Sequence, residues 1–236
     1  MKFLILLSIV AILVVSGCTQ NIQTENKTFS ECSTCNEGYE CSDNLCIMTP
    51  ETVVKEYLKS SNINGLDERI EKLEIVKRYT TGYLNERENV ELEFTKSLKY
   101  ELEDFLSSLS IICPDIYGKK YCDNLEIVTR SSTDSFFAVK VKPTFVKREE
   151  IEKNKAKIRV KMKVITSYNI TDSTLVYLLV KENNSWLIYD AIDSNGDFLS
   201  QVERTEEISK FNNETVENLT EVWMNALQSM IDEKKR

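Results

Sequence analysis

The sequence predicts an α+β fold: a curved antiparallel sheet packed against N-terminal helices in a cone-like arrangement, with an extra C-terminal helix and a small disulfide knot before the domain. Apolar residues recur every three to four positions from about residue 50 to residue 110, which is the period of a helix. After Cys122 they recur at every second position in segments separated by short polar turns, which is typical of antiparallel strands. The helical period returns near residue 212.

The first eighteen residues are typical of an export signal. A basic Lys2 precedes the apolar run Phe3 to Val15, and two small residues, Ser16 and Gly17, precede Cys18. The run is shorter than the roughly 20 apolar residues that a membrane-spanning helix needs. Its end, Val15-Ser16-Gly17-Cys18, resembles the lipobox of prokaryotic lipoproteins, in which the signal peptide (here 1–17) is removed and the cysteine is lipidated. The resemblance implies a lipid anchor on Cys18 at the extracytoplasmic face of the cell membrane, and the alternative is a signal anchor that is never cleaved.

Residues 18–31 are polar and predict a flexible tether, and residues 32–46 predict a disulfide knot. The knot holds four of the seven cysteines in a stretch with almost no apolar residues, and two more cysteines bracket a short loop. A zinc site is the alternative for the first four, but an exported chain favours disulfides. The segment 36–46, NEGYECSDNLC, also resembles small disulfide modules of exported proteins, although its pairing stays open. The cysteines expected to form three disulfides are Cys32, Cys35, Cys41, Cys46, Cys113 and Cys122.

One α+β domain is expected over residues 49–236, and it opens with helices. Thr49 or Thr52 can cap the first helix, and Pro50 suits its first turn. The stretch LEIVKRY at the end of the second helix fits a strand equally well. The last helix carries an apolar stripe that includes Trp223 and should pack back onto the domain. The periodicity predicts helices over 49–62, 67–79, 88–110 and 212–233.

Strands are expected between the third helix and the last one. Residues 175–180 are apolar at every position, which indicates a strand covered on both faces. Trp186 begins the final strand and is expected to be buried under the helices. The alternating pattern predicts strands over 125–129, 137–146, 156–165, 174–181 and 186–193.

Three segments of this domain resemble the nuclear transport factor 2-like superfamily, in particular its exported lipoprotein members with a lumazine-binding-like domain. They are TPETVVKEYLKSSN at 49–62, AKIRVKMKVI at 156–165 and STLVYLLVKENNSWLIYDAI at 173–192. The resemblance implies a cone with a pocket between helices and sheet. The middle helical segment at 66–110 and the last helix depart from the family pattern. Because this superfamily includes both enzymes and binding modules, the resemblance does not settle the function.

Composition excludes several classes of enzyme. The chain has no histidine, so a Ser-His-Asp or Cys-His hydrolase is excluded. Its six glycines are too scattered for a phosphate-binding loop, and no metal or cofactor is expected. The formal net charge of −8 argues against nucleic acid as a partner.

Strand alternation places a set of basic side chains on one face of the sheet. Such a face could approach anionic lipid headgroups or an acidic protein of the cell envelope, or could simply keep the sheet soluble. The residues concerned are Lys140, Lys142, Lys157, Arg159, Lys161 and Lys163.

Four aromatic residues, Tyr57, Tyr177, Trp186 and Tyr189, could line a ligand pocket in the cone, although their spacing also fits a packed core. The segment 190–197, DAIDSNGD, lacks the regular spacing of a calcium loop, so a turn at Asn195-Gly196 is expected instead.

N-glycosylation sequons begin at five asparagines, of which Asn26 and Asn183 are the best candidates because they lie in expected loops. The other three sequons begin at Asn169, Asn213 and Asn218.

Taken together, these features predict a membrane-anchored extracytoplasmic lipoprotein that acts as a non-enzymatic binding or assembly module. The alternative is a histidine-free hydrolase that uses carboxylates in the cone pocket. An open, carboxylate-lined pocket would favour the enzyme, and a pocket filled by side chains would favour the module.

Overall fold

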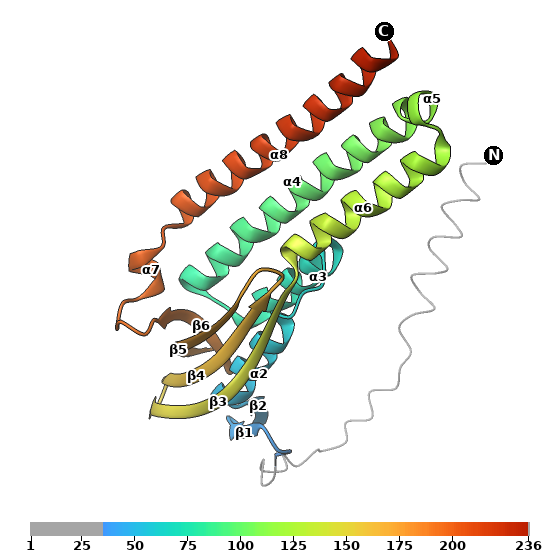
Figure 1. Ribbon diagram of the computed structural model, residues 1–236. Coiled ribbons are helices and arrows are strands. Elements are labelled where there is room, and N and C mark those ends of the chain that lie inside the picture. Colours follow the sequence, from blue (N-terminus) through green and yellow to red (C-terminus); the bar gives the residue numbers. More distant parts are fainter. Residues whose placement is uncertain (1–34, 236) are drawn as a thin grey trace, which may run out of the picture.

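The computed structural model describes residues 35–235 and confirms the α+β prediction (Figure 1). A hairpin leads into helices, a four-stranded antiparallel sheet in the order β3-β4-β5-β6 follows, and a long helix ends the chain. The hairpin strands and the helices before the sheet are β1 (Tyr39–Ser42), β2 (Leu45–Met48), α2 (Pro50–Ser60), α3 (Leu66–Val76), the 3-10 turn η1 (Lys77–Tyr79), α4 (Gly82–Ile112), α5 (Pro114–Tyr117) and α6 (Lys119–Phe137). The remaining elements are β3 (Val139–Glu152), β4 (Lys155–Thr166), β5 (Ile170–Glu182), β6 (Ser185–Ile192), α7 (Leu199–Val202) and α8 (Thr205–Lys234).

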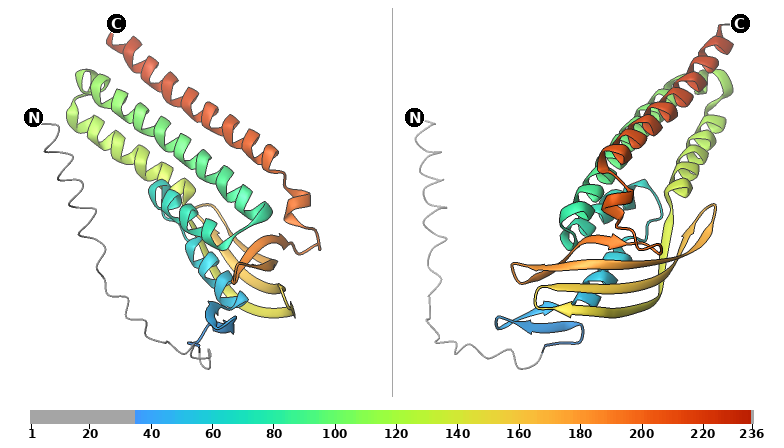
Figure 2. Two further views of the ribbon diagram at one scale, coloured as in Figure 1. Left: turned by 180° about the vertical axis from the view of Figure 1, so that it is seen from behind. Right: turned by 90° about the vertical axis from the view of Figure 1, so that its left-hand side faces the viewer.

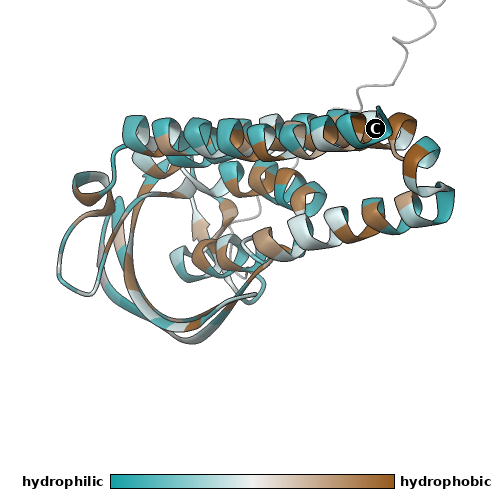
Figure 3. Cartoon of the chain, turned by 45° about the horizontal axis from the view of Figure 1, so that its top comes forward, coloured by the Kyte–Doolittle hydropathy of each residue, from teal (hydrophilic) through white to brown (hydrophobic). Residues whose placement is uncertain are grey.

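The sheet curves around α2, and hydrophobic and hydrophilic residues alternate along its strands (Figure 3). Side chains of β4 at 156, 158, 160 and 162 point inward and are buried. Their neighbours at 157, 159, 161 and 163 point outward, as strand alternation requires. The β5–β6 turn follows from its sequence, because Asn183 and Asn184 both have positive φ angles, which asparagine tolerates better than most residues.

Between the inner face of the sheet and α2 lies the first hydrophobic core. Thr49 caps α2, because its hydroxyl oxygen accepts a hydrogen bond from the backbone N–H of Thr52 at 3.3 Å. Val54 on α2 and Ile158 on β4 are both fully buried in this core. The core also includes Leu84 from the beginning of α4, so this helix starts within the cone.

A second core lies outside the cone, along the three long helices α4, α6 and α8. These helices lie side by side in a layer that extends beyond the sheet (Figures 1 and 2). Leu98, Leu102 and Leu109 of α4 form the centre of this core. Trp223 of α8 stacks on Phe105 of α4 with 5.6 Å between ring centroids, so the last helix packs on the rest of the chain as predicted. Its partner is α4 rather than the cone.

The structure corrects several predicted boundaries. Residues 125–129 belong to α6 and not to a strand, and the ambiguous segment at 73–79 is helical. Alternation over five residues is too short to identify a strand, and Leu125 packs into the second core as part of a helix. The final helix begins at Thr205 instead of residue 212, and α4 begins at Gly82.

Two disulfides are present among the described residues. Cys113–Cys122 joins the end of α4 to the beginning of α6, and Cys35–Cys46 staples the β1–β2 hairpin, with Cα–Cα distances of 5.8 and 5.6 Å. Cys35 and Cys46 therefore cannot serve as thiolate ligands of a zinc ion. Cys41 forms no disulfide with any described residue, and Cys18 and Cys32 lie outside the described residues.

The stapled hairpin packs directly against the domain, so it is part of the folded body. Ile47 of β2 is buried in the first core. The indole N–H of Trp186 donates a hydrogen bond to Glu40 Oε1 at 2.7 Å. Trp186 is buried as expected, but at this end of the sheet the hairpin contributes to its cover.

Within residues 35–235, no helix combines the length and the apolar character needed to cross a membrane.

Candidate functional site

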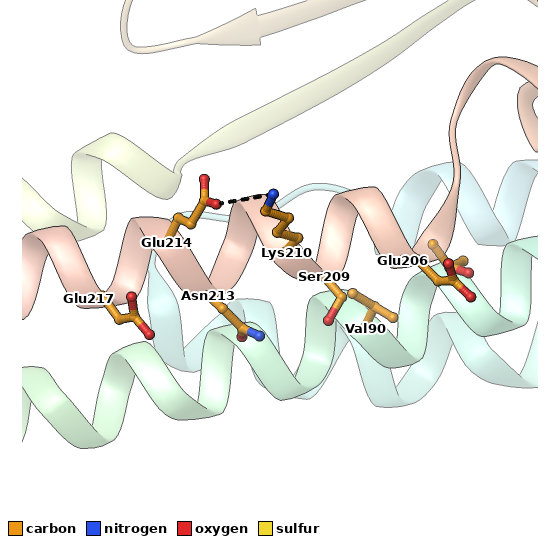
Figure 4. A pocket seen from close by; sticks show the side chains of 8 residues that line it. Val90, Glu206, Ser209, Lys210, Asn213, Glu214 and Glu217 are labelled. Atoms are coloured by element: carbon orange, nitrogen blue, oxygen red, sulfur yellow. Dashed lines mark ion pairs between the residues drawn. The ribbon is translucent and has the colours of Figure 1, made fainter.

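Two regions of the described chain hold hollows of about 350 Å³ or more, and the region between α4 and α8 holds two of them, of about 590 and 460 Å³. The largest, of about 590 Å³, is an open groove between α4 and α8. Ser209, Asn213 and Glu217 point from α8 toward α4, whereas Lys210 and Glu214, which also line the groove, point away from α4 and form an ion pair with each other (Figure 4). This groove is shallow and open to solvent along its length. The third hollow lies inside the cone and is the candidate site.

The cone cavity has a volume of about 350 Å³ and lies between the sheet and the helices α2, α3 and α4. Its size is within the usual range for small-molecule sites. One wall is the inner face of the sheet and is mainly apolar, with Val141, Met162 and Leu175. The helical wall carries three cations and two carboxylates, which are Arg69, Lys72, Arg87, Glu88 and Glu91.

Glu88 is the most deeply buried charged side chain of this wall, with 8% of its surface exposed. The Tyr57 hydroxyl donates a hydrogen bond to Glu88 Oε1 at 3.0 Å. Burial raises the pKa of the Glu88 carboxyl, although the nearby Arg87 guanidinium and the Tyr57 hydroxyl oppose the shift. The pKa of Tyr57 is also raised, first by burial and then by the carboxylate of Glu88. Tyr57 therefore remains a neutral hydrogen-bond donor at physiological pH.

Arg69 links α3 to α4 at the edge of the cavity. Its guanidinium pairs with Glu91 at 2.7 Å and donates a second hydrogen bond from Nε to Thr95 Oγ1 at 3.1 Å. On α4, Arg87 pairs with Glu203, from the segment between α7 and α8, at 3.1 Å. Both arginine side chains are thus fixed by ion pairs with carboxylates, so the charged wall is preorganised in the absence of a ligand.

The structure brings together two of the four aromatic residues proposed for a pocket. Tyr57 and Tyr177 both line the cavity, and their rings meet edge to face with 5.7 Å between centroids. Trp186 lies elsewhere, against the β1–β2 hairpin. Tyr189 lies at an irregularity in the β5–β6 pairing and lines a small hollow with Lys157 and Leu178, which is outside the cone cavity.

Sequence reasoning missed the polar residues of the helical wall. A signal existed for Glu88, because it falls between Leu84 and Leu92 at intervals of four, on a stripe of α4 that is otherwise apolar or buried. No comparable signal marks Arg69 or Glu91, since their meeting depends on how α3 packs against α4.

The basic residues predicted on the sheet do lie on one face, opposite the cavity. Lys142 pairs with Lys163 across β3 and β4, and Lys140 stands beside them at the same end of the sheet. Lys157, Lys161 and Lys163 are exposed, whereas Arg159 is partly covered and forms an ion pair with Glu149.

The turn after β6 is organised by its own side chains and has the form of a tight turn. Asp193 Oδ1 accepts hydrogen bonds from the backbone N–H groups of Asn195 and Asp197, and Gly196 has a φ angle of 95°. Among residues 35–235, no group of three or more histidine, cysteine or acidic side chains could hold a metal ion.

No family model and no curated protein matches the chain. Among solved structures, it is similar to the phospholipid-binding protein from Ralstonia solanacearum, which was solved in complex with a phospholipid. The two are 14% identical, the similarity covers 77% of this chain and 96% of that chain, and the TM-score is 0.28. A TM-score this low does not indicate a shared fold. The resemblance to the nuclear transport factor 2-like superfamily stays a prediction.

Proposed function

We propose that this chain is a lipid-anchored extracytoplasmic binding protein whose ligand site is the cone cavity. The observation that carries the proposal is the pairing of an apolar sheet wall with a fixed polar wall around about 350 Å³ of unfilled space. A cavity with this lining suits a small amphipathic ligand, because its apolar part can lie on the sheet while its polar head meets Arg69, Lys72 and Arg87. Each of the three cations already pairs with a carboxylate, Arg69 with Glu91, Arg87 with Glu203 and Lys72 with Glu68. The wall is therefore close to neutral, and it favours a polar head that is neutral or carries at most a single negative charge.

The export signal and the lipobox-like sequence supply the location. If Cys18 is lipidated, the lipid holds the protein on the membrane, and two chains suffice for stable anchoring. The variant Cys18→Ser should then be released to the medium or retain its signal peptide. Mass spectrometry of the membrane-bound wild type tests this part separately, and an unmodified Cys18 would contradict it.

The cavity can be tested with the fluorescent probe 1-anilinonaphthalene-8-sulfonate, which joins an apolar ring system to one anionic group. Ser173 lines the cavity from β5, so Ser173→Phe should fill part of the space and weaken probe binding at least about tenfold, as expected for loss of a buried apolar contact. The matched control is Ser194→Phe in the exposed loop after β6, which should bind the probe like wild type. Equal binding by both variants, with both folded by circular dichroism, would contradict a ligand site in the cone.

One observation favours a second candidate, the histidine-free hydrolase. Glu88 and Glu91 lie three residues apart on α4 and both line the cavity, and the raised pKa of Glu88 is what a general acid requires. Both carboxylates already have partners, however, in Tyr57 and Arg69. Hydrolysis of any member of a panel of chromogenic glycosides, lost in Glu88→Gln, would establish the enzyme in place of the binding protein.

A further inference from the structure

The outer face of the sheet carries a row of lysines that leads to one end of β3 and β4. Lys142 stands opposite Lys163, Lys163 stands opposite Asp172 on β5, and Lys140 stands opposite Ile165. Partners that are directly opposite share a face of the sheet, so these side chains form one cluster. We call Lys140, Lys142, Lys161 and Lys163 the lysine cluster.

All four members of the lysine cluster are exposed. Within the described residues, the acid that faces the cluster from a neighbouring strand is Asp172, which is itself exposed. Further along the same strands, Arg159 is neutralised by Glu149. Lys147 and Lys157 continue the basic face toward the other end of the sheet, and the four lysines of the cluster lie at the end where β4 turns into β5.

At this same end, the β4–β5 turn projects from the sheet (Figure 2). The turn also carries exposed apolar side chains. The turn is ordered, because the backbone N–H of Thr166 bonds to the Asn169 carbonyl at 2.9 Å. Tyr168 is 73% exposed and Ile170 is 65% exposed. Phe136, at the end of α6, is 53% exposed and meets the Tyr168 ring edge to face at 5.7 Å between centroids.

We infer that this end of the sheet is a docking surface for a membrane that contains anionic lipids. The lysine cluster would lie against the headgroups, and Tyr168, Ile170 and Phe136 would enter the interfacial region. Tyrosine is favoured at that depth because one end of its ring is apolar and the other is polar. The apolar stems of the lysines can lie along the membrane surface beside the inserted tip, while their ammonium groups stay among the lipid phosphates.

The composition of the surface favours a membrane over an acidic protein as its occupant. Lysine is depleted from the centre of protein–protein interfaces, because its strongly hydrated ammonium is costly to desolvate. At a lipid surface the ammonium stays hydrated and still gains attraction from the anionic headgroups. A protruding apolar tip with lysines beside it is therefore better matched to a bilayer.

The inference does not depend on a lipid at Cys18, so it can be tested on residues 19–236. This chain includes all the described residues, 35–235, with both hydrophobic cores and the strand pairings found among them. Co-sedimentation with vesicles of phosphatidylglycerol and phosphatidylcholine should show binding, and vesicles of phosphatidylcholine alone should bind much less. Raising the salt concentration should weaken the binding, because exposed charges are screened.

Two pairs of variants separate the roles of charge and apolar insertion. Lys142→Gln with Lys163→Gln should lower the partition coefficient about thirtyfold, as expected for two lysines at an anionic surface. Its control removes the same charge from α8 and the residue that follows it, as Lys210→Gln with Lys235→Gln, and should bind like wild type. Tyr168→Ser with Ile170→Ser should also weaken binding, by about tenfold, whereas Phe211→Ser on α8 removes an equally exposed apolar group without effect.

Insertion has a readout of its own. In a Tyr168→Trp variant, the fluorescence of the new indole should shift to shorter wavelength with anionic vesicles and should be quenched by brominated lipid. The inference is overturned if wild type fails to bind anionic vesicles at low salt, if the α8 controls lose as much binding as the test variants, or if brominated lipid does not quench the new tryptophan. A glycan on Asn169 of the native protein would also overturn it, because Asn169 lies in the turn that must enter the membrane.

Discussion

Trp186 provides a direct test of whether the β1–β2 hairpin is part of the core. The side chain is 4% exposed, and its indole N–H donates to Glu40 of the hairpin at 2.7 Å. Removing a large buried aromatic side chain costs about 3–5 kcal/mol, so Trp186→Ala should lower the free energy of unfolding by about 4 kcal/mol. In a chain of this length, that loss corresponds to a fall of about 8–16 °C in melting temperature.

The variant Trp186→Phe separates the hydrogen bond from the packing. A hydrogen bond to a charged group contributes about 1.5–3 kcal/mol. Because Glu40 is only partly buried and can bond to water when the indole is gone, we expect the loss of this bond in Trp186→Phe to cost the lower end of that range. Urea unfolding under oxidising conditions, followed by far-UV circular dichroism, gives these free energies. A double-mutant cycle of Trp186→Phe with Glu40→Ala should show a coupling energy of about 1 kcal/mol.

The control for these variants lies on the hairpin itself. Leu45 is 57% exposed, so Leu45→Ala should change the stability by less than about 0.5 kcal/mol. If Trp186→Ala cost no more than Leu45→Ala, the hairpin would be an appendage, and the reasoning that places it in the core would be wrong.

Three further predictions concern other parts of the chain. Replacing Cys113 and Cys122 together with serine should lower the free energy of unfolding in urea by about 2–3 kcal/mol, since the bridge closes a short loop between α4 and α6; an unchanged midpoint would show that packing alone fixes this loop. Because the pKa of Glu88 is raised in the folded state, the folded protein binds more protons than the unfolded chain above the ordinary carboxyl value of 4.5, so stability is lost as pH rises through this window. Melting temperatures of Glu88→Gln should accordingly exceed those of wild type by a margin that grows with pH, and parallel pH profiles would contradict the burial of this charge. Trp223→Ala should release α8 from α4 and speed tryptic cleavage in α8, whereas wild type should resist; equal cleavage rates would mean that the stacking on Phe105 does not hold the helix.

The parts of the fold that could be predicted are those decided by short-range pattern. The cap at Thr49 with Pro50 after it locates α2, and the unbroken alternation of 156–163 locates β4. The segment 125–129 could not be assigned in this way, because its five residues fit both periods. Its conformation is decided by contacts with α4 and by the Cys113–Cys122 bridge, which are long-range features.

In the candidate site, too, residues placed by short-range pattern could be predicted, and residues placed by long-range contacts could not. Tyr57 and Tyr177 could be proposed from their spacing on a helix and a strand, and both line the cavity. Trp186 also has the spacing of an inward-facing strand residue, but it lies against the hairpin. Alternation predicts the face of the sheet on which a side chain lies, and it does not predict which end of the sheet the helices cover. The pairing of Arg69 with Glu91 joins residues 22 positions apart, and neither residue stands out in its own helix.

The Cys35–Cys46 disulfide determines which segment bears the force when the chain is pulled from its N-terminal side. If the preceding chain is attached to a membrane, tension reaches Cys35 and passes through the bridge to Cys46, four residues before α2 begins. The ten residues between the two cysteines are bypassed, so β1, whose Glu40 bonds to Trp186, carries almost no load. The force acts instead on the short segment leading into α2, whose buried face is held by the first core. A reducing environment would remove this bypass and allow the hairpin to be peeled from the sheet first.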